Sequence, residues 1–395
     1  VAVPGAAHLE QTGLLPSSLK RPGSPASGLL AEQDRHTLLT NLRMNDLKRK
    51  LIRRLDMLIV DEVSMVRADV LDAMDLVLRH VRRNYLMPFG GLQMIFIGDP
   101  FQLPPVVREE DWTILKHFYR GAYFFDAHII HQYPPVYIEL KKIYRQKDEV
   151  FIGMLNRVRN GTAHEEDVAL LNECYEPGTD RKDGYIVLCT HNHIADDINK
   201  RGLREIDEPL YTFEATITGE INERNISGER LLQLKKGAQV MFIRNDLQVP
   251  RRYYNGKTGH VSSVNATSIR VAFDNEPDEV AVPLETWRAV RYRLNATTGN
   301  IEEEETGSFT QYPLRLAWAV TIHKSQGLTL DKAVIDLNRA FAPGQVYVAL
   351  SRCTSLQGIV LRSPLRMQNI MVDDRVVEFC QYEQEGDELE ARSEE

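Results

Sequence analysis

The chain has 395 residues, of which 43% are hydrophobic, so it holds more material than one hydrophobic core usually organises and we expect two or three domains. Its 48 Lys and Arg against 56 Asp and Glu give a net charge of −8, which excludes a uniformly basic nucleic-acid coat protein but leaves room for a local basic groove. Its four cysteines form no CxxC pair and no Cys/His cluster, which favours reduced thiols over disulfides or a zinc site.

The first segment that predicts regular structure is a short buried strand. Residues 1–36 are rich in Gly, Pro, Ser and Ala without sustained periodicity, so they predict a loop. A basic, helix-permissive stretch over residues 35–55 leads into the apolar run 57–60, which is typical of a strand buried in a parallel sheet. This run ends abruptly in Asp61 and Glu62.

A helix and a second strand follow. Apolar residues recur on one side over residues 68–80, and a buried-type strand over residues 93–97 ends in Gly98 and Asp99. Strand, helix and strand describe a βαβ unit, whose right-handed crossover places both strand ends at one edge of the sheet. Open α/β folds bind their ligands at this edge.

A second α/β region is predicted to start near Tyr137, to be interrupted, and to resume near Pro313. Its buried strands are expected at residues 186–189, 333–337 and 359–361. The interruption contains short strand-like runs separated by Asn, Gly and Asp turns, at residues 239–243, 260–264, 269–273 and 280–282. The sequence therefore predicts an α/β fold with two parallel-sheet domains and a small β-barrel inserted into the second.

The acidic pair at the end of the first strand suits nucleotide hydrolysis. Asp61 can hold Mg²⁺ on phosphates, and Glu62 can orient and deprotonate an attacking water. Gln102, in the run GDPFQLPP at residues 98–105, would lie at the same edge and could reach a γ-phosphate. An ordinary solvated strand end and a proline-rich turn with an incidental glutamine are the alternatives.

Two arginines are candidates for the positive charge that phosphoryl transfer requires. Arg145 lies in LKKIYRQ at residues 140–146, and Arg352 ends the helix-like run QVYVALSR at residues 345–352. A surface position or a salt bridge is the commoner fate of an arginine and stays open for both.

Five segments resemble, in order, the motifs of Pif1-type superfamily 1 DNA helicases. LIVDEVSM at residues 58–65 resembles motif II, and IGDPFQLPP at residues 97–105 resembles motif III and is preceded by the similar run PFGGLQ at residues 88–93. The segments LKKIYRQ, AVTIHKSQG at residues 319–327 and GQVYVALSR at residues 344–352 resemble motifs IV, V and VI. Five motifs in compatible order and spacing are far more specific than any one of them.

The resemblance implies ATP and Mg²⁺ as cofactors. It implies that Asp61 binds Mg²⁺ and the nucleotide, that Glu62 activates water and that Gln102 senses the γ-phosphate. It also implies that Arg145 and Arg352 are arginine fingers from the second domain and that Gly327 belongs to the nucleotide site. The implied domains are RecA-like P-loop NTPase domains, the first incomplete at residues 1–132 and the second at 133–224 and 306–381, with an SH3-like insert at 225–305 and an acidic tail at 382–395.

The same resemblance implies a track for nucleic acid. Motif V implies that Thr321, His323, Lys324 and Ser325 face a single strand, and Thr190 and Asn192 resemble further phosphate contacts. Hydroxyls, amides and a lysine bind phosphate without reading sequence, as a translocating motor requires. A locally satisfied helix-end histidine is the alternative for His323, a polar turn is the alternative for residues 191–193, and no third ligand supports a metal role there.

One segment imitates a phosphate-binding loop. The GKT of NGKT at residues 255–258 has Arg251 where a Walker A loop needs its first glycine, and strand-like runs flank it, so we expect a hairpin turn. No GxxxxGK[ST] occurs in the chain. The family would place this P-loop upstream of Val1, since residues 1–7 resemble an abbreviated motif Ia. We therefore expect a truncated chain that is inactive alone, with true loss of catalysis as the alternative.

The predicted function is an ATP-dependent DNA helicase that moves 5′ to 3′ on single-stranded DNA and unwinds duplex junctions in DNA repair, recombination, replication or telomere maintenance. A catalytically dead single-strand-binding or scaffold protein is one alternative, and an NTPase acting on a small molecule or a protein is another. No apolar run approaches the roughly 18 residues of a membrane span and no secretory signal is recognisable. We expect a monomer with no membrane partner, in the cytoplasm or nucleoid of a bacterium or the nucleus of a eukaryote.

Overall fold

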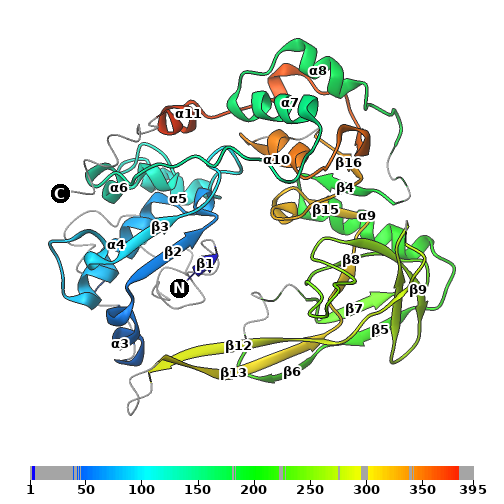
Figure 1. Cartoon of the computed structure of the whole chain (residues 1–395), viewed down its shortest axis with the longest axis horizontal. Helices are drawn as coiled ribbons and strands as arrows, with labels where there is room; N and C mark the ends of the chain where they lie inside the picture. The colour runs from blue at the N-terminus through cyan, green and yellow to red at the C-terminus, as the bar shows by residue number, and fades with distance from the viewer. Residues whose placement is uncertain are drawn as a thin grey trace. The chain divides into compact units, whose positions relative to one another are not determined.

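The computed structural model describes residues 2–4, 39, 42, 44, 46–179, 182, 184–221, 226, 228–274, 276–294, 301–337, 340 and 342–381. The chain divides into two compact units (Figure 1). Unit 1 comprises Val1–Lys141, Arg291–Glu304 and Asp373–Glu395, and unit 2 comprises Lys142–Val290 and Glu305–Val372. The predicted acidic tail at residues 382–395 lies outside the described residues.

Unit 1 contains a parallel sheet in the order β1-β2-β3, formed by β1 (Ala2–Pro4), β2 (Met57–Asp61) and β3 (Gln93–Phe96). In register, Ile59 lies between Ala2 of β1 and Ile95 of β3. The βαβ unit predicted from the sequence is therefore confirmed, but its second strand is not buried as predicted: β3 ends at Phe96, and its residues are half-buried or exposed. β1 lies within a segment for which the sequence predicts a loop, because three residues are too few for a periodic signal.

Helix α4 (Ala68–Arg82) connects β2 to β3 and covers the sheet (Figure 1). Its apolar side chains recur every three or four residues and are buried, which is the pattern expected of a helix packed by one face. The buried apolar set is Ala68, Leu71, Ala73, Met74, Val77, Leu78 and Val81. The other short elements of this region are α3 (Asp46–Arg54), η3 (Val63–Met65), η4 (Pro88–Gly91), α5 (Glu109–Leu115), η5 (Phe124–Asp126) and α6 (His128–Gln132).

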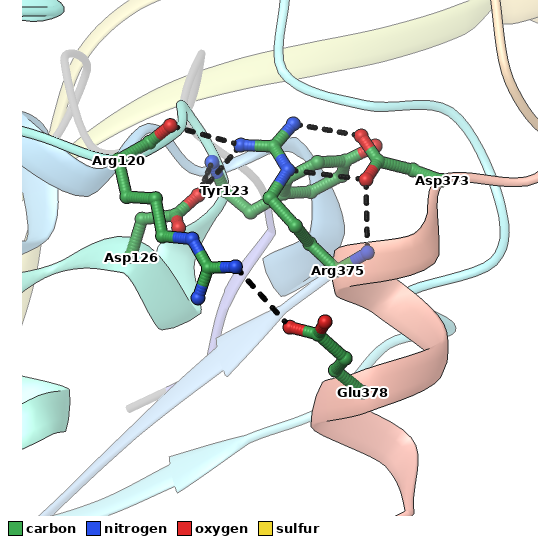
Figure 2. A network of polar contacts seen from close by, with 6 residues as sticks. All are labelled: Arg120, Tyr123, Asp126, Asp373, Arg375 and Glu378. Carbon is green, nitrogen blue, oxygen red and sulfur yellow. Dashed lines mark hydrogen bonds and ion pairs between the residues drawn. The ribbon is translucent and has the colours of Figure 1, made fainter.

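The last helix, α11 (Asp374–Cys380), packs on unit 1 (Figure 2). The ring of Phe379 stacks on Phe125 with centroids 4.6 Å apart. Arg375 donates from Nη1 to the carbonyl of Arg120 at 3.3 Å. The sequence assigned this helix to the second domain, at residues 306–381, and the structure places it with the first because its aromatic ring and its arginine find their partners there.

Unit 2 contains a parallel sheet in the order β15-β4-β16-β17, formed by β15 (Ala319–Thr321), β4 (Ile186–Cys189), β16 (Ala333–Ile335) and β17 (Ile359–Leu361). All residues of these strands are buried, as expected of a sheet with both faces covered. The accompanying elements are α7 (Glu149–Asn160), α8 (Glu165–Asn172), α9 (Asn192–Glu205), α10 (Gln345–Ser351), η7 (His323–Ser325), η8 (Leu356–Gly358) and η9 (Met367–Asn369). The predicted strands are confirmed, except that the third ends at Ile335.

Between β4 and β15 the chain forms antiparallel β-structure, as predicted. The order of one sheet is β11-β10-β9-β8-β14, a second pairs β5 with β7, and a third has the order β12-β13-β6. The strands are β5 (Tyr211–Glu214), β6 (Thr216–Gly219), β7 (Leu231–Leu234), β8 (Gln239–Phe242), β9 (Thr258–Val264), β10 (Ile269–Ala272), β11 (Val280–Ala281), β12 (Glu285–Leu294), β13 (Ile301–Gln311) and β14 (Leu314–Leu316). Closure into an SH3-like barrel stays a prediction.

Two predicted boundaries of this insert are wrong. β13 runs through the predicted boundary between residues 305 and 306, and β14 pairs with β8, so the parallel sheet resumes at Ala319 and not near Pro313. At the other end, antiparallel strands begin at Tyr211, before residue 225. These strands are short or strongly polar, so their apolar alternation is weak in the sequence.

The NGKT segment at residues 255–258 forms a turn that leads into β9, which pairs antiparallel with β8. Gly256 has φ of +94°, a conformation that favours glycine. The prediction of a turn in place of a P-loop is confirmed. No helix in the described ranges is long and apolar enough to cross a membrane.

Candidate functional site

The ends of β2 and β3 meet at one edge of the unit 1 sheet. The amide of Ile97 donates to the carbonyl of Val60 at 2.8 Å, and the amide of Val63 donates to the carbonyl of Ile97 at 2.9 Å. The first bond joins the end of β2 to the segment that follows β3, and the second joins the segments that follow the two strands. Asp61 and Gln102, which the sequence places after these strands, therefore belong to the same edge, as predicted.

Glu62 stands in an uncommon backbone conformation at this edge. Its φ of 53° and ψ of 44° are left-handed, and its amide donates to Oδ1 of Asp61 at 2.9 Å. A side chain in this conformation costs roughly 1 kcal/mol, and such residues persist where the surrounding structure fixes them, often at functional sites. Gly98 contributes to this fixation, because a Cβ there would lie 2.9 Å from the amide nitrogen of Val63. The acidic pair is thus held rigidly by the neighbouring strand.

Asp99 orients Gln102. The amide of Gln102 donates to the carbonyl of Asp99 at 3.0 Å, and its side-chain Nε2 lies 3.4 Å from Oδ2 of the same residue. Oδ1 of Asp99 also accepts from the amide of Phe101 at 3.2 Å. An aspartate bonding an amide two residues on is an Asx turn, and the run DPFQ was the signal that could have assigned Asp99 this role.

The carboxylates fit magnesium held together with phosphates. The described residues contain no group of three or more His, Cys, Asp or Glu that could hold a metal ion by themselves. Magnesium in phosphate-transferring sites is usually bound by one or two carboxylates, with water and phosphate oxygens completing the shell. The exposed carboxylate of Asp61 meets that requirement.

Unit 2 brings the two predicted arginines together. Arg145 donates from Nε to the hydroxyl of Thr329 and from Nη1 to the carbonyl of Ser351, both at 3.1 Å. Arg352 is 3% exposed and donates from Nε to the carbonyl of Val348 at 3.1 Å and from Nη2 to the hydroxyl of Ser351 at 3.0 Å. Ser351 is therefore the common partner of both arginines, and a surface position for Arg352 is excluded. Burial lowers the pKa of Arg145.

The predicted nucleic-acid residues lie at the carboxyl edge of the unit 2 sheet, where β15 and β4 run parallel with Thr321 opposite Cys189. The amide of Lys324 donates to the hydroxyl of Thr321 at 3.3 Å. The hydroxyl of Ser325 is buried and donates to the carbonyl of Ile322 at 2.8 Å. Ser325 therefore shapes this turn and does not face outward as predicted, because its hydroxyl is used inside the turn.

Exposure separates the remaining nucleic-acid candidates. Thr190 is buried and its hydroxyl lies 2.7 Å from Nδ1 of His191, whereas Asn192 and Lys324 are exposed. Asn192 is the first residue of α9, so the alternative of a polar turn at residues 191–193 is wrong. His323 is half-buried, and burial lowers its pKa below the ordinary 6.5, which leaves it neutral at pH 7. Gly327 is exposed with φ of +77°.

Comparison with known proteins identifies the family. The family described as PIF1-like helicase matches residues 27–169. The human ATP-dependent DNA helicase PIF1 is 38% identical over 76% of this chain and 45% of its own length. The ATP-dependent DNA helicase Pif1 of Bdellovibrio bacteriovorus is 34% identical over 83% of this chain and 70% of its own length. This chain belongs to the Pif1 helicase family.

Solved Pif1 structures extend the match to nearly the whole chain. The structure of Bacteroides sp Pif1 in complex with ADP-AlF4 has a TM-score of 0.84 and 34% identity, and it covers 96% of this chain and 86% of its own. Bacteroides Pif1 bound to ssDNA has a TM-score of 0.62 and 37% identity, with coverage of 96% and 87%. The predicted fold class, α/β with two RecA-like domains, is thereby confirmed.

The family match covers only some of the predicted site residues. The Pif1 family match at residues 27–169 includes Asp61, Gln102 and Arg145, whereas Lys324 and Arg352 lie beyond it. The chain spans about half the length of the vertebrate Pif1 relatives, between 44% and 48% for the human, rat, mouse and zebrafish proteins.

Proposed function

We propose that this chain is the motor region of an ATP-dependent DNA helicase that hydrolyses ATP with Mg²⁺ and moves 5′ to 3′ along single-stranded DNA. The observation that carries the proposal is the edge of the unit 1 sheet, where Asp61 ends β2 and where Glu62 and Gln102 follow β2 and β3 in segments that are hydrogen-bonded to each other. Family membership supports it, since the Pif1 relatives are ATP-dependent DNA helicases. The protein acts as a monomer at duplex junctions during repair, recombination, replication or telomere maintenance, in the compartment that holds the DNA.

When bound, ATP would supply the γ-phosphoryl group, and Mg²⁺ would supply positive charge that offsets the negative charge of the phosphates. Asp61 provides a carboxylate oxygen for Mg²⁺, and Glu62 accepts the proton of the water that attacks phosphorus. Gln102, oriented by Asp99, donates to the γ-phosphate or its attacking water. The bond from phosphorus to the bridging oxygen of ADP breaks as the bond to water forms, so the products are ADP and inorganic phosphate.

Arg145 and Arg352 stabilise the negative charge that develops on the transferred group. Arginine suits this role because its planar, permanently charged fork can bind two oxygens at once. Both guanidinium groups are oriented by hydrogen bonds within unit 2, which reduces the entropy lost when they engage phosphate. Gly327 is the last residue of motif V, and we assign it to the backbone that approaches the nucleotide.

The DNA track is assigned to the carboxyl edge of the unit 2 sheet. Lys324 and Asn192 are exposed there and suit direct contacts to phosphate, with neutral His323 as a hydrogen-bonding partner. The buried hydroxyls of Thr190, Thr321 and Ser325 hold the turns that carry these residues. Contacts of this kind track the backbone without reading sequence.

A second function, single-strand binding without ATP hydrolysis, would use the same exposed side chains of Lys324 and Asn192 at the carboxyl edge of the unit 2 sheet. It would not require the acidic pair of unit 1.

ATP hydrolysis separates the two functions. We would compare this chain with a P-loop-extended chain, in which the same residues follow the GxxxxGK[ST] segment of a Pif1 relative, each with and without single-stranded DNA. Hydrolysis that single-stranded DNA stimulates in either form supports the motor. DNA binding without hydrolysis in both forms supports the binding protein, and hydrolysis indifferent to DNA would support an NTPase with another substrate.

A further inference from the structure

Gln146 follows Arg145 and lies buried, with 6% of its surface exposed. Its side-chain Nε2 donates to the carbonyl of Ser351 at 3.0 Å and to the carbonyl of Cys353 at 2.9 Å. These two carbonyls stand immediately before and after Arg352. A side chain from the segment that precedes α7 therefore fixes the backbone on both sides of an arginine more than 200 residues away.

The carbonyls at the end of α10 require partners from elsewhere. Helix α10 ends at Ser351, and the last carbonyls of a helix have no donor within it. Gln146 supplies two donors, and the amide of Leu330 donates to the carbonyl of Arg352 itself at 2.9 Å. Three consecutive carbonyls are thus bonded. Because peptide units are planar, this fixes the direction in which the Arg352 side chain leaves the backbone.

We propose that Gln146 is a positioning residue that holds Arg352 where ATP hydrolysis requires its guanidinium. The inference rests on the proposed function. Arg145 donates to the same carbonyl of Ser351, so a shift of this carbonyl displaces both arginines. Displacement of a catalytic group by about 1 Å can lower a rate on the order of 100-fold.

The same two hydrogen bonds could serve only to stabilise the end of α10. Two other buried glutamines, each of which also donates to two carbonyls, are controls for this purely stabilising role. Gln239 is buried and donates from Nε2 to the carbonyls of Tyr185 at 2.8 Å and Ala317 at 3.0 Å. Gln311 is buried and donates to the carbonyls of Phe213 at 2.9 Å and Glu229 at 3.2 Å. Replacement by methionine removes two donors in each of the three cases, and at Gln311 it also removes the oxygen that accepts from the amide of Tyr312 at 2.9 Å. Of the three glutamines, only Gln146 bonds the backbone beside Arg352.

The test uses the form of the protein, this chain or the P-loop-extended chain, whose ATP hydrolysis is stimulated by single-stranded DNA. Gln146→Met, Gln239→Met and Gln311→Met are compared by thermal unfolding and by kcat and KM for ATP. We expect similar losses of stability in all three. Gln146→Met lowers kcat by roughly 10- to 100-fold with KM changed less than about threefold, while the two controls change kcat less than about twofold. If Gln146→Met does not fold, Gln146→Ala, which leaves room for water at both carbonyls, takes its place under the same criteria.

A double-mutant cycle with Arg352→Ala decides whether the effect passes through that arginine. We expect Gln146→Met to lower kcat less than about twofold further in the Arg352→Ala background, because residues that act as a unit are not additive. A kcat for Gln146→Met equal to that of the controls, or an additive loss in the cycle, would overturn the positioning role alone. If Arg352→Ala by itself leaves kcat unchanged, the arginine's part in the proposed function fails and the positioning role fails with it.

Discussion

Arg375, in the first turn of α11, lies 3.6 Å from the carboxylate of Asp126, whose side chain is only 4% exposed (Figure 2). The same guanidinium pairs with Asp373 at 2.7 Å. Burial raises the pKa of Asp126, and the positive charge of Arg375 opposes that rise. The cation that compensates a buried carboxylate of unit 1 is therefore carried by the segment that follows unit 2 in the sequence.

Removal of this cation should destabilise unit 1. We predict that Arg375→Leu lowers the free energy of unfolding by roughly 3 kcal/mol, because an uncompensated buried carboxylate remains. Arg120→Ala is the matched control: Arg120 pairs with Glu378 at 3.5 Å, but both side chains are largely exposed, so we expect less than about 0.5 kcal/mol. Urea unfolding measures both, and a loss for Arg375→Leu no larger than that for Arg120→Ala would contradict the compensation of Asp126 by Arg375.

The hydroxyl of Thr329 should matter to Arg145. It accepts from Nε of Arg145 at 3.1 Å, and a hydrogen bond to a charged group contributes about 1.5 kcal/mol or more, which corresponds to roughly tenfold in rate. We predict that Thr329→Val lowers kcat for ATP about tenfold and that Thr329→Ser retains most of the activity. Equal activity of the valine and serine variants would exclude this orienting role.

Lys324 should contribute one phosphate contact to DNA binding. We predict that Lys324→Ala weakens binding of single strands of any sequence and reduces the slope of log K against log salt concentration by about 1. Lys332, also exposed, precedes β16 and so lies at the opposite edge of the parallel sheet. Lys332→Ala should leave the slope unchanged. If the two substitutions change the slope equally, the assignment of the DNA track to the carboxyl edge is wrong.

Asp246 should make the insert sensitive to acid. The hydrogen bond from Arg252 lowers the pKa of Asp246 to about 2 from an ordinary value of 3.8. A carboxyl whose pKa is lower in the folded state contributes stability above the ordinary pKa, and this is lost as pH falls from about 3.8 to about 2. We predict that Asp246→Asn is less stable than the parent at pH 5 and that the difference shrinks towards pH 2. Urea unfolding across this range would contradict the assignment if the difference stays constant.

The sequence was sufficient where the signal is local. The strands β2 and β3 are visible as apolar runs followed by the carboxylates Asp61 and Asp99, and their parallel pairing follows from the handedness of βαβ connections. The turn at Gly256 could be recognised because it lacks the strand and helix that a P-loop needs.

The remaining features depend on contacts between distant segments. No sequence pattern links Gln146 to the carbonyls of Ser351 and Cys353, because glutamine side chains are mostly exposed in proteins and a buried one gives no local signal. Helix α11 was assigned to the wrong domain because its partners, Phe125 and Asp126, become neighbours only on folding. Burial of the Ser325 hydroxyl depends on the η7 turn, whose three residues are too few to be predicted from periodicity.

The measurement that tests the central claim most directly is ATP hydrolysis by the Glu62→Gln variant. The variant is made in whichever form of the protein, this chain or the P-loop-extended chain, hydrolyses ATP faster when single-stranded DNA is added. Glutamine keeps the size of Glu62 but cannot accept the proton of the attacking water, so we predict a fall in kcat on the order of 10²- to 10⁴-fold, with unchanged affinity for single-stranded DNA. Glu110→Gln, an exposed carboxylate of α5, is the control and should keep full activity. Hydrolysis by Glu62→Gln at the rate of this control would contradict the assignment of the acidic pair as the catalytic centre.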